Sequence, residues 1–160
     1  MKAATAGTAR RSPTADDLAT WRGFIETSER LRAIIGSRMQ ADSGLSTGDY
    51  SVLLSLSEAS DHRARSSELA AKIGWERSRL SHHLGRMEQR GLIRRDDCAT
   101  DSRGAEVVLT SAGADAFRRA SAPHLHAIQH LFVGALTPSQ LASVRELTDA
   151  LTDSLDRADR

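Results

Sequence analysis

The sequence predicts a mainly α-helical protein that carries one small β-hairpin. Apolar residues recur three and four positions apart over most of the chain, which is the period of a helix with one buried face. Only the stretch around residues 92–109 holds two short β-like runs separated by turn-forming residues. Aromatic residues make up 4% of the 160 residues, so leucine, alanine, valine and isoleucine must fill most of the core.

The N-terminal part of the chain predicts a tail followed by two helices. Residues 1–15 are small, polar and basic, which is typical of a disordered segment. A long helix is expected over 16–41, and Gly44 and Leu45 form a short connection after it. The run Ser46-Thr47-Gly48-Asp49 has the composition of a helix cap and predicts a helix over 47–59. The polar residues 60–65 predict a loop.

The middle of the chain predicts a helix, a tight turn and a second helix. The first helix spans 66–73, where a serine pair can accept hydrogen bonds from the free N–H groups, and Gly74 ends it. The second spans 77–90, with Leu80, Leu84 and Met87 as a narrow apolar stripe and polar side chains on the opposite face. This arrangement is the helix-turn-helix pattern.

A hairpin follows directly and forms a wing. Residues 92–95 and 106–109 are strand-like, and residues 97–104 between them are rich in turn formers. At the tip, Asp101 can brace Arg103 through a charge-assisted hydrogen bond, and Gly104 permits a sharp turn. An arginine held at a hairpin tip suits insertion into the electronegative minor groove of DNA.

The C-terminal part predicts two more helices. The first spans 111–135, and Pro123 within it predicts a kink or a break near Ser121. Thr137-Pro138-Ser139-Gln140 is a strong start for the last helix, over 138–156. Together with the first helix, these helices carry more apolar surface than a small domain can cover. We therefore expect a winged helix-turn-helix domain at 46–110 between dimerisation helices at 16–45 and 111–157.

These motifs resemble those of the MarR family of bacterial transcriptional regulators. Three phrases carry the resemblance, which runs from about Trp21 to Leu155: Arg86-Met87-Glu88-Gln89-Arg90-Gly91-Leu92-Ile93-Arg94-Arg95, Asp101 to Gly104, and Val107-Val108-Leu109-Thr110-Ser111-Ala112-Gly113. The resemblance implies a homodimer with interleaved N- and C-terminal helices. It also implies a small effector, often an aromatic or phenolic acid, bound between these helices and the winged domain.

Candidate DNA contacts follow from the outer face of the second helix and from the wing. Hydroxyl, imidazole and guanidinium groups bind bases and phosphates, and on this helix they belong to Arg77, Ser78, Arg79, Ser81, His82 and Arg86. The wing contributes Arg103, with Asp101 as its brace, and Arg95. The resemblance implies contacts to the DNA backbone at Ser46, Thr47, Arg63 and Ser67.

The candidate effector and sensor residues allow more than one interpretation. The residues Trp21, Arg22, Phe24, Tyr50 and Trp75 suit an effector cleft, but the aromatic ones equally suit an ordinary core. Cys98 lies among aspartates, which disfavour a thiolate, so it is expected to be structural rather than a redox sensor. His126 and His130 stand one helical turn apart, a spacing that zinc sites use, yet few other ligands are near. We expect no metal and no cofactor, and we expect one or more of His124, His126 and His130 to line a ligand cleft or the dimer interface.

Charge and composition narrow the class of function. The net charge is +1, but residues 62–104 hold ten Lys/Arg against six Asp/Glu, as phosphate binding requires. No apolar run spans a membrane, no secretory signal is present, and one cysteine fits a cytoplasmic protein. No catalytic motif occurs in the sequence. The adjacent Ser81, His82 and His83 cannot form a catalytic relay, because neighbouring side chains on a helix diverge by about 100°.

The sequence therefore predicts a homodimeric, sequence-specific DNA-binding regulator. We expect a repressor that binds a pseudo-palindromic operator and whose DNA affinity is set by a small molecule. The alternative is a winged-helix protein-interaction module or scaffold without specific DNA binding, in which the basic face meets an acidic protein surface.

Overall fold

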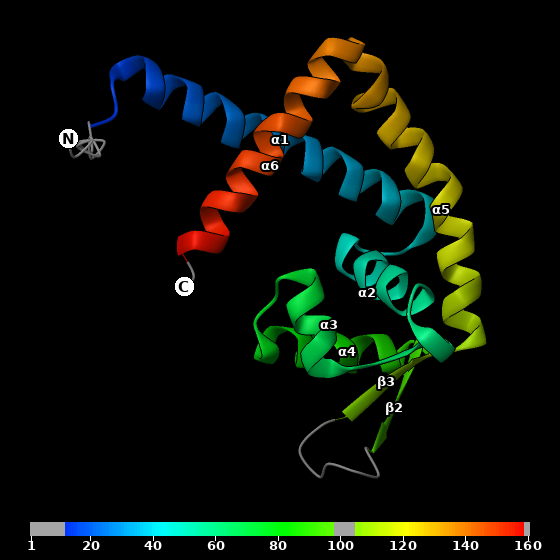
Figure 1. The fold of residues 1–160 in the computed structure, drawn as a ribbon. Coiled ribbons are helices and arrows are strands. Elements are labelled where there is room, and N and C mark those ends of the chain that lie inside the picture. Colours follow the sequence, from blue (N-terminus) through cyan, green and yellow to red (C-terminus); the bar gives the residue numbers. More distant parts are fainter. Residues whose placement is uncertain (1–11, 98–104, 159–160) are drawn as a thin grey trace, which may run out of the picture. The chain divides into compact units, whose positions relative to one another are not determined.

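A computed structural model describes residues 12–97 and 105–158 of the chain. Helices dominate, and the described strands form one small antiparallel sheet (Figure 1), which confirms the predicted fold class. The elements are α1 (Ala15–Ser43), α2 (Thr47–Ser57), the 3-10 turn η1 (Ser60–His62), β1 (Arg63–Arg65), α3 (Ser66–Ile73), α4 (Arg77–Gln89), β2 (Ile93–Asp97), β3 (Ala105–Leu109), α5 (Ser111–Leu131), the 3-10 turn η2 (Val133–Ala135) and α6 (Pro138–Ala158). Within the described residues, no helix combines the length and the apolar character that a membrane span requires.

The chain divides into two compact units, residues 1–34 and residues 35–160, and the boundary falls inside α1. The described part of the first unit is the N-terminal portion of α1, where Leu18, Trp21 and Phe24 are 53%, 61% and 41% exposed. The second unit contains the winged helix, the segment from residue 46 to residue 110, together with α5 and α6.

The sheet has one strand more than the expected hairpin. Its order is β1-β3-β2, with both pairs antiparallel, so β3 is the central strand and Arg63 pairs with Val108. The expectation of a loop over 60–65 is therefore wrong for residues 63–65. Asp61 and His62 both have φ 56° and turn the chain into β1. A three-residue strand is too short to show an alternation of apolar and polar residues, which is why the sequence pattern misses it.

The core of the winged helix is aliphatic, as the composition predicts. The predicted stripe on α4, formed by Leu80, Leu84 and Met87, is at most 1% exposed. It packs in one cluster with residues of α2, α3 and the sheet, among them Leu53, Leu56, Leu69, Ile93 and Val107. Burying one such side chain contributes about 1.5–3 kcal/mol, so this stripe fixes which face of α4 is turned to solvent.

Caps define where the helices of the winged helix begin and end. Ser46 accepts from the Asp49 N–H and Asp49 accepts from the Ser46 N–H, which confirms the predicted cap of α2. At α3 the N-cap is Arg65, and Glu68 accepts from the Arg65 N–H, so the cap lies one residue before the expected serine pair. Gly74 ends α3 in the left-handed conformation, φ 66°, as predicted.

The two C-terminal helices follow the sequence pattern with two corrections. The helix expected over 111–135 ends at Leu131, and the 3-10 turn η2 covers residues 133–135. α5 continues through Pro123, so the alternative of a break near Ser121 is wrong. Proline removes one N–H donor, and both Arg119 and Pro123 are exposed, so water can satisfy the carbonyl group that loses its partner. The cap of α6 is confirmed, since Thr137 and Gln140 exchange hydrogen bonds. No described residue of α6 is buried.

Candidate nucleic-acid interface

One face of α4 is exposed, and it carries every residue of this helix that the sequence predicts to contact DNA. The opposite face is the buried Leu80–Leu84–Met87 stripe. A helix turns by about 100° per residue, so burying that stripe fixes the direction of all the others. The exposed side chains are Arg77, Ser78, Arg79, Ser81, His82 and Arg86.

Most basic side chains of the winged helix already have an acidic partner. Ion pairs with N–O distances of 2.6–2.9 Å join Arg63 to Glu106, Lys72 to Glu58, Arg90 to Asp49, Arg94 to Asp96 and Arg95 to Glu88. The hydrogen bonds from Arg95 lower the pKa of Glu88, and the two from Arg94 lower the pKa of Asp96. The charges of Arg63 and Arg95, both predicted DNA contacts, are thus balanced by neighbouring carboxylates.

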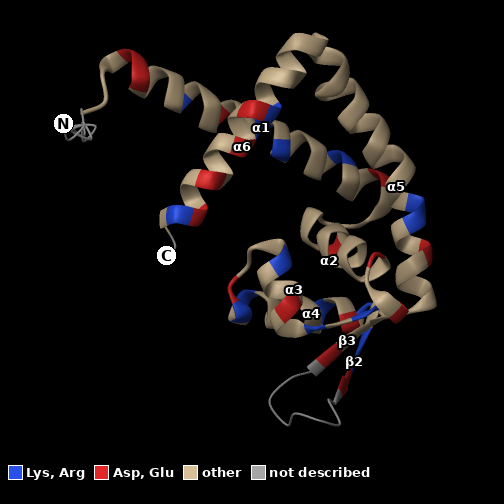
Figure 2. Ribbon diagram, in the orientation of Figure 1, with Lys and Arg blue, Asp and Glu red and all other residues tan. Residues whose placement is uncertain are grey.

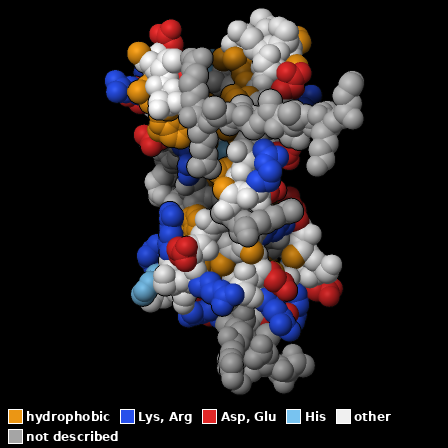
Figure 3. Space-filling view, turned by 60° about the vertical axis from the view of Figure 1, so that its left-hand side comes forward, with side chains coloured by type: hydrophobic (Ala, Val, Ile, Leu, Met, Phe, Trp, Pro, Cys, Tyr) orange, Lys and Arg blue, Asp and Glu red, His pale blue; other side chains and the backbone are white. Residues whose placement is uncertain are grey.

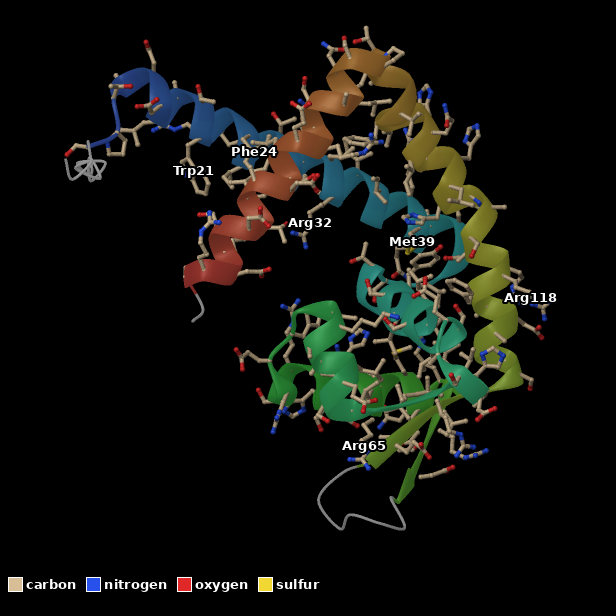
Figure 4. All side chains as sticks on the ribbon, in the orientation of Figure 1. Trp21, Phe24, Arg32, Met39, Arg65 and Arg118 are labelled. Carbon is tan, nitrogen blue, oxygen red and sulfur yellow. The ribbon has the colours of Figure 1, made fainter. Side chains whose placement is uncertain are left out.

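The described basic side chains that have no acidic partner are concentrated on α4. Among the described residues of the winged helix, those without an ion-pair partner are Arg65, Arg77, Arg79 and Arg86. Three of these four lie on the exposed face of α4, while β2 carries basic and acidic residues side by side and β3 carries one acidic residue (Figure 2). The fourth, Arg65, projects from the start of α3 (Figure 4) and was not among the predicted contacts. Unbalanced positive charge on one helix face is what phosphate binding requires.

A hollow of about 240 Å³ lies between the first turn of α2 and α4. Ser46, Thr47 and Gly48 line it from α2, and the side chains from the other wall are Trp75, Arg79, His83 and Arg86. The structure therefore brings two predicted backbone-contacting residues, Ser46 and Thr47, next to two predicted recognition-helix arginines. The N-terminus of α2 adds unpaired N–H groups and a partial positive charge to the same place.

A buried polar cluster behind this hollow was missed by the sequence analysis. Asp49 is 3% exposed and His83 8% exposed, and Nε2 of His83 lies 3.0 Å from Oδ1 of Asp49. Arg90 donates to Oδ2 of Asp49 at 2.8 Å and to the Gly44 carbonyl oxygen at 2.9 Å. Burial opposes ionisation of Asp49, but contacts from His83, Arg90 and Ser46 outweigh it and hold the pKa of that carboxyl well below its usual range. Asp49 was identified only as a capping residue.

The tip of the wing falls outside the described residues. Arg103, its brace Asp101, and Cys98 all lie in the segment 98–104. Ser67 is exposed on the first turn of α3, and Arg63 lies in β1.

Two of the predicted effector residues, Tyr50 and Trp75, lie on different sides of α2. Trp21, Arg22 and Phe24 are exposed on the first half of α1. Tyr50 instead packs on α5, with ring centroids 5.1 Å from Phe117 and 4.5 Å from His124. Trp75 contacts the opposite side of α2, because Gly48 and Tyr50 stand about 200° apart on that helix. Tyr50 and Trp75 therefore belong to different sites.

The histidines of α5 differ in their surroundings. His124 is half-buried, its pKa is lowered by burial, and its Nδ1 atom has no hydrogen-bond partner among the described residues. His126 and His130 are exposed. The described part of the chain holds no group of three or more side chains placed to bind a metal ion.

A helix-turn-helix with an unbalanced arginine face, followed by a two-stranded wing, defines a winged-helix DNA-binding protein. The comparison with known families is more specific, since the model of the MarR family matches residues 45–104. Together with the relatives described next, this shows that the chain belongs to the MarR family of transcriptional regulators. Members of this family are DNA-binding regulators rather than enzymes. The resemblance inferred from the sequence is thereby confirmed.

Two solved structures from Streptomyces coelicolor are similar over nearly the whole chain. AbsC, a MarR family transcriptional regulator, is 32% identical with a TM-score of 0.84, covering 91% of this chain and 98% of its own. Sco3205, a MarR family regulator solved in complex with DNA, is 34% identical with a TM-score of 0.87, covering 93% of both chains. The transcriptional repressor MprA of Escherichia coli is 25% identical over 124 residues, which are 78% of this chain and 70% of MprA.

Proposed function

We propose that the protein is a homodimeric repressor that binds a pseudo-palindromic operator, with one α4 helix in the major groove of each half-site. The observation that carries this proposal is the exposed α4 face, where Arg77, Arg79 and Arg86 have no acidic partner among the described residues, while every other described basic residue of the winged helix except Arg65 has one. A relative solved on DNA and a relative named as a repressor both support it. Acting on a bacterial chromosome, such a repressor works in the cytoplasm.

The proposed contacts fall into two groups. Base edges are read from α4, where arginine pairs with guanine and serine or histidine makes single contacts. Phosphates are held by Thr47 and Ser46 at the start of α2 and by Ser67 and Arg65 at α3, whereas Arg103 of the wing belongs with the first group and enters the minor groove. Arg63 and Arg95 contribute less in this proposal, because each is held by a carboxylate at 2.9 Å and 2.6 Å respectively.

Dimerisation is proposed through the first and last helices. Apolar side chains stay exposed on both, with Trp21 and Phe24 projecting from α1 (Figure 4). On α6, Leu147, Leu151 and Leu155 are 45%, 40% and 65% exposed and lie one helical turn apart. Hydrophobic side chains are visible on the surface in Figure 3. Exposed stripes of this kind mark interaction surfaces, and an isologous dimer places two α4 helices for a two-fold symmetric site.

A small-molecule effector is proposed at the α2–α5 contact. There Tyr50 packs against Phe117 and His124, and Nδ1 of His124 is buried without a partner. A phenol hydroxyl could donate a hydrogen bond to that nitrogen, or a carboxylate could accept one from it in the other ring tautomer, while the ring of the ligand packs on the aromatic side chains. Binding would then displace α2, whose first turn lines the DNA-facing hollow.

The test is a fluorescence-anisotropy titration against DNA from immediately upstream of the gene, with unrelated competitor DNA and two salt concentrations. We expect two protomers per site, competitor-resistant binding and a steep loss of affinity with salt. Arg86→Ala should weaken binding by about 1–3 kcal/mol, whereas Arg94→Ala, which removes the same charge from an ion pair with Asp96, should change it little. Weak, sequence-blind binding would favour the protein-interaction module instead.

A further inference from the structure

Arg86 is held by a buried histidine, and it has no acidic partner in the part of the chain that the structure describes. Its Nη2 atom lies 3.1 Å from Nδ1 of His83, one helical turn earlier on α4. A guanidinium group has donors only, so Nδ1 must be the acceptor, and the proton of the neutral imidazole ring lies on Nε2. That ring edge faces Asp49 on α2, with Nε2 3.0 Å from Oδ1. Nε2 has no hydrogen-bond partner among the described residues, so the contact with Asp49 is electrostatic.

Asp49 is itself rigidly anchored, which gives His83 a fixed support. Its other oxygen, Oδ2, accepts from Arg90 at 2.8 Å and from the backbone N–H of Ser46 at 2.9 Å. Its side chain is 4% exposed. The contacts thus form a chain from the cap of α2, through Asp49 and His83, to the exposed guanidinium group of Arg86.

Arg79 is held from the same side by a ring contact. Its guanidinium carbon lies 4.2 Å from the centroid of the Trp75 ring, a cation–π contact. The indole in turn meets the His83 ring edge-on, with centroids 5.1 Å apart and an interplanar angle of 88°. Gly48 permits this packing, since a Cβ there would lie 2.6 Å from Trp75 Cη2. His83 and the Trp75 ring that packs on it therefore support two of the exposed arginines of α4, Arg86 and Arg79.

We propose that His83 and Trp75 are positioning residues that fix Arg86 and Arg79 for contact with DNA without touching the DNA themselves. This role rests on the proposed function, and it explains part of the DNA affinity by the fixed positions of the two arginine side chains. A long arginine side chain that is free in solution loses about 2 kcal/mol of rotamer entropy when it is fixed. Holding the guanidinium group in place before DNA arrives removes part of that cost.

The test separates the two ring nitrogens of His83. His83→Asn keeps an acceptor near the position of Nδ1 and so retains the contact with Arg86. His83→Gln places its polar atoms near Nε2 and retains only the contact with Asp49. We expect His83→Gln to weaken DNA binding about fivefold and His83→Asn less than about twofold. A merely structural role in supporting Asp49 predicts the opposite order.

A double-mutant cycle then shows whether His83 acts through Arg86. In an Arg86→Ala background, His83→Gln should weaken binding by less than about twofold, because the group that it positions is gone. Trp75→Leu should weaken binding about threefold in the wild-type background and have little effect in an Arg79→Ala background. Thermal denaturation of each variant shows whether it is folded.

The outcomes distinguish this inference from the proposed function. If the wild-type protein binds neither the upstream duplex nor a random-sequence duplex, both fail. If it binds and His83→Gln matches the wild type, or if His83→Gln has its full effect in the Arg86→Ala background, the positioning role alone is overturned. Equal losses for His83→Asn and His83→Gln also overturn it.

Discussion

The substitution Gly48→Ala tests how far the packing behind α4 sets the DNA affinity. A Cβ at this position would lie 2.6 Å from Trp75 Cη2 and 3.1 Å from His83 Cε1. Non-bonded carbon atoms rest at about 3.5–4.0 Å, so the indole must move by about 1 Å. Because Arg79 stacks on that indole, its guanidinium group must move or lose the contact.

The expected effect on folding is small, because two contributions oppose each other. Alanine favours a helix over glycine by up to about 1 kcal/mol, while overpacking costs about 1–3 kcal/mol. Trp75 is only half-buried and can shift towards solvent. We therefore expect a net loss of about 0–2 kcal/mol in the free energy of unfolding. The DNA affinity should fall about tenfold, which corresponds to about 1.4 kcal/mol.

The assay pairs fluorescence anisotropy on the operator duplex with thermal denaturation. Gly23→Ala is the matched control, since it makes the same change inside a helix but its Cβ would meet nothing within 4 Å. As a control for the change in helix propensity alone, it should unfold at the same or a slightly higher temperature than the wild type. Wild-type DNA affinity in Gly48→Ala would refute the reasoning, because it would mean that the position of Trp75 does not affect DNA binding through Arg79.

Three further predictions concern folding and assembly. Gly113→Ala should prevent stable folding, measured by circular dichroism, because its Cβ would overlap the backbone carbonyl oxygen of Leu92. The pKa of Asp49 is lowered in the folded protein, so its ionisation stabilises the fold above the ordinary carboxyl pKa of about 4, and this contribution is lost as the pH falls below that value. In acid denaturation, Asp49→Asn should therefore lose less of its free energy of unfolding than the wild type does. Leu151→Asp should yield a folded monomer in sedimentation, since Leu151 is 40% exposed in one chain; an intact dimer would exclude this stripe as the interface.

Periodicity was enough to predict the helices and the outward face of α4, because both follow from where apolar residues recur. The stripe Leu80, Leu84 and Met87 alone determines which α4 side chains face solvent. β1 was not predictable in this way, since three residues carry no period. Nor was the anchoring of Arg86, because Asp49 is 34 positions earlier in the sequence and meets His83 only when α2 packs on α4.

The family motif from Val107 to Gly113, which follows the wing, has a structural explanation that the sequence alone does not give. Thr110 donates to the Gly91 carbonyl oxygen at 2.7 Å and accepts from the Gly113 N–H at 3.0 Å. It thereby ties the end of α4 to the start of α5. Gly113 comes so close to the Leu92 backbone that no side chain fits. Threonine and glycine at this spacing are thus required by packing, and they indicate the fold rather than a DNA contact.

Charge counting and geometry select different arginines for the interface. The excess of ten basic over six acidic residues in 62–104 locates the DNA-binding segment but treats its arginines as equivalent. Pairing then removes Arg63, Arg90, Arg94 and Arg95, whose partners come from other strands, other helices or two residues along a strand. Among the described residues, Arg77, Arg79 and Arg86 on α4 then remain without a carboxylate partner. DNA phosphates can therefore pair with these guanidinium groups without an ion pair being broken first. The affinity of this interface should therefore depend on Arg77, Arg79 and Arg86 far more than on the number of basic residues around them.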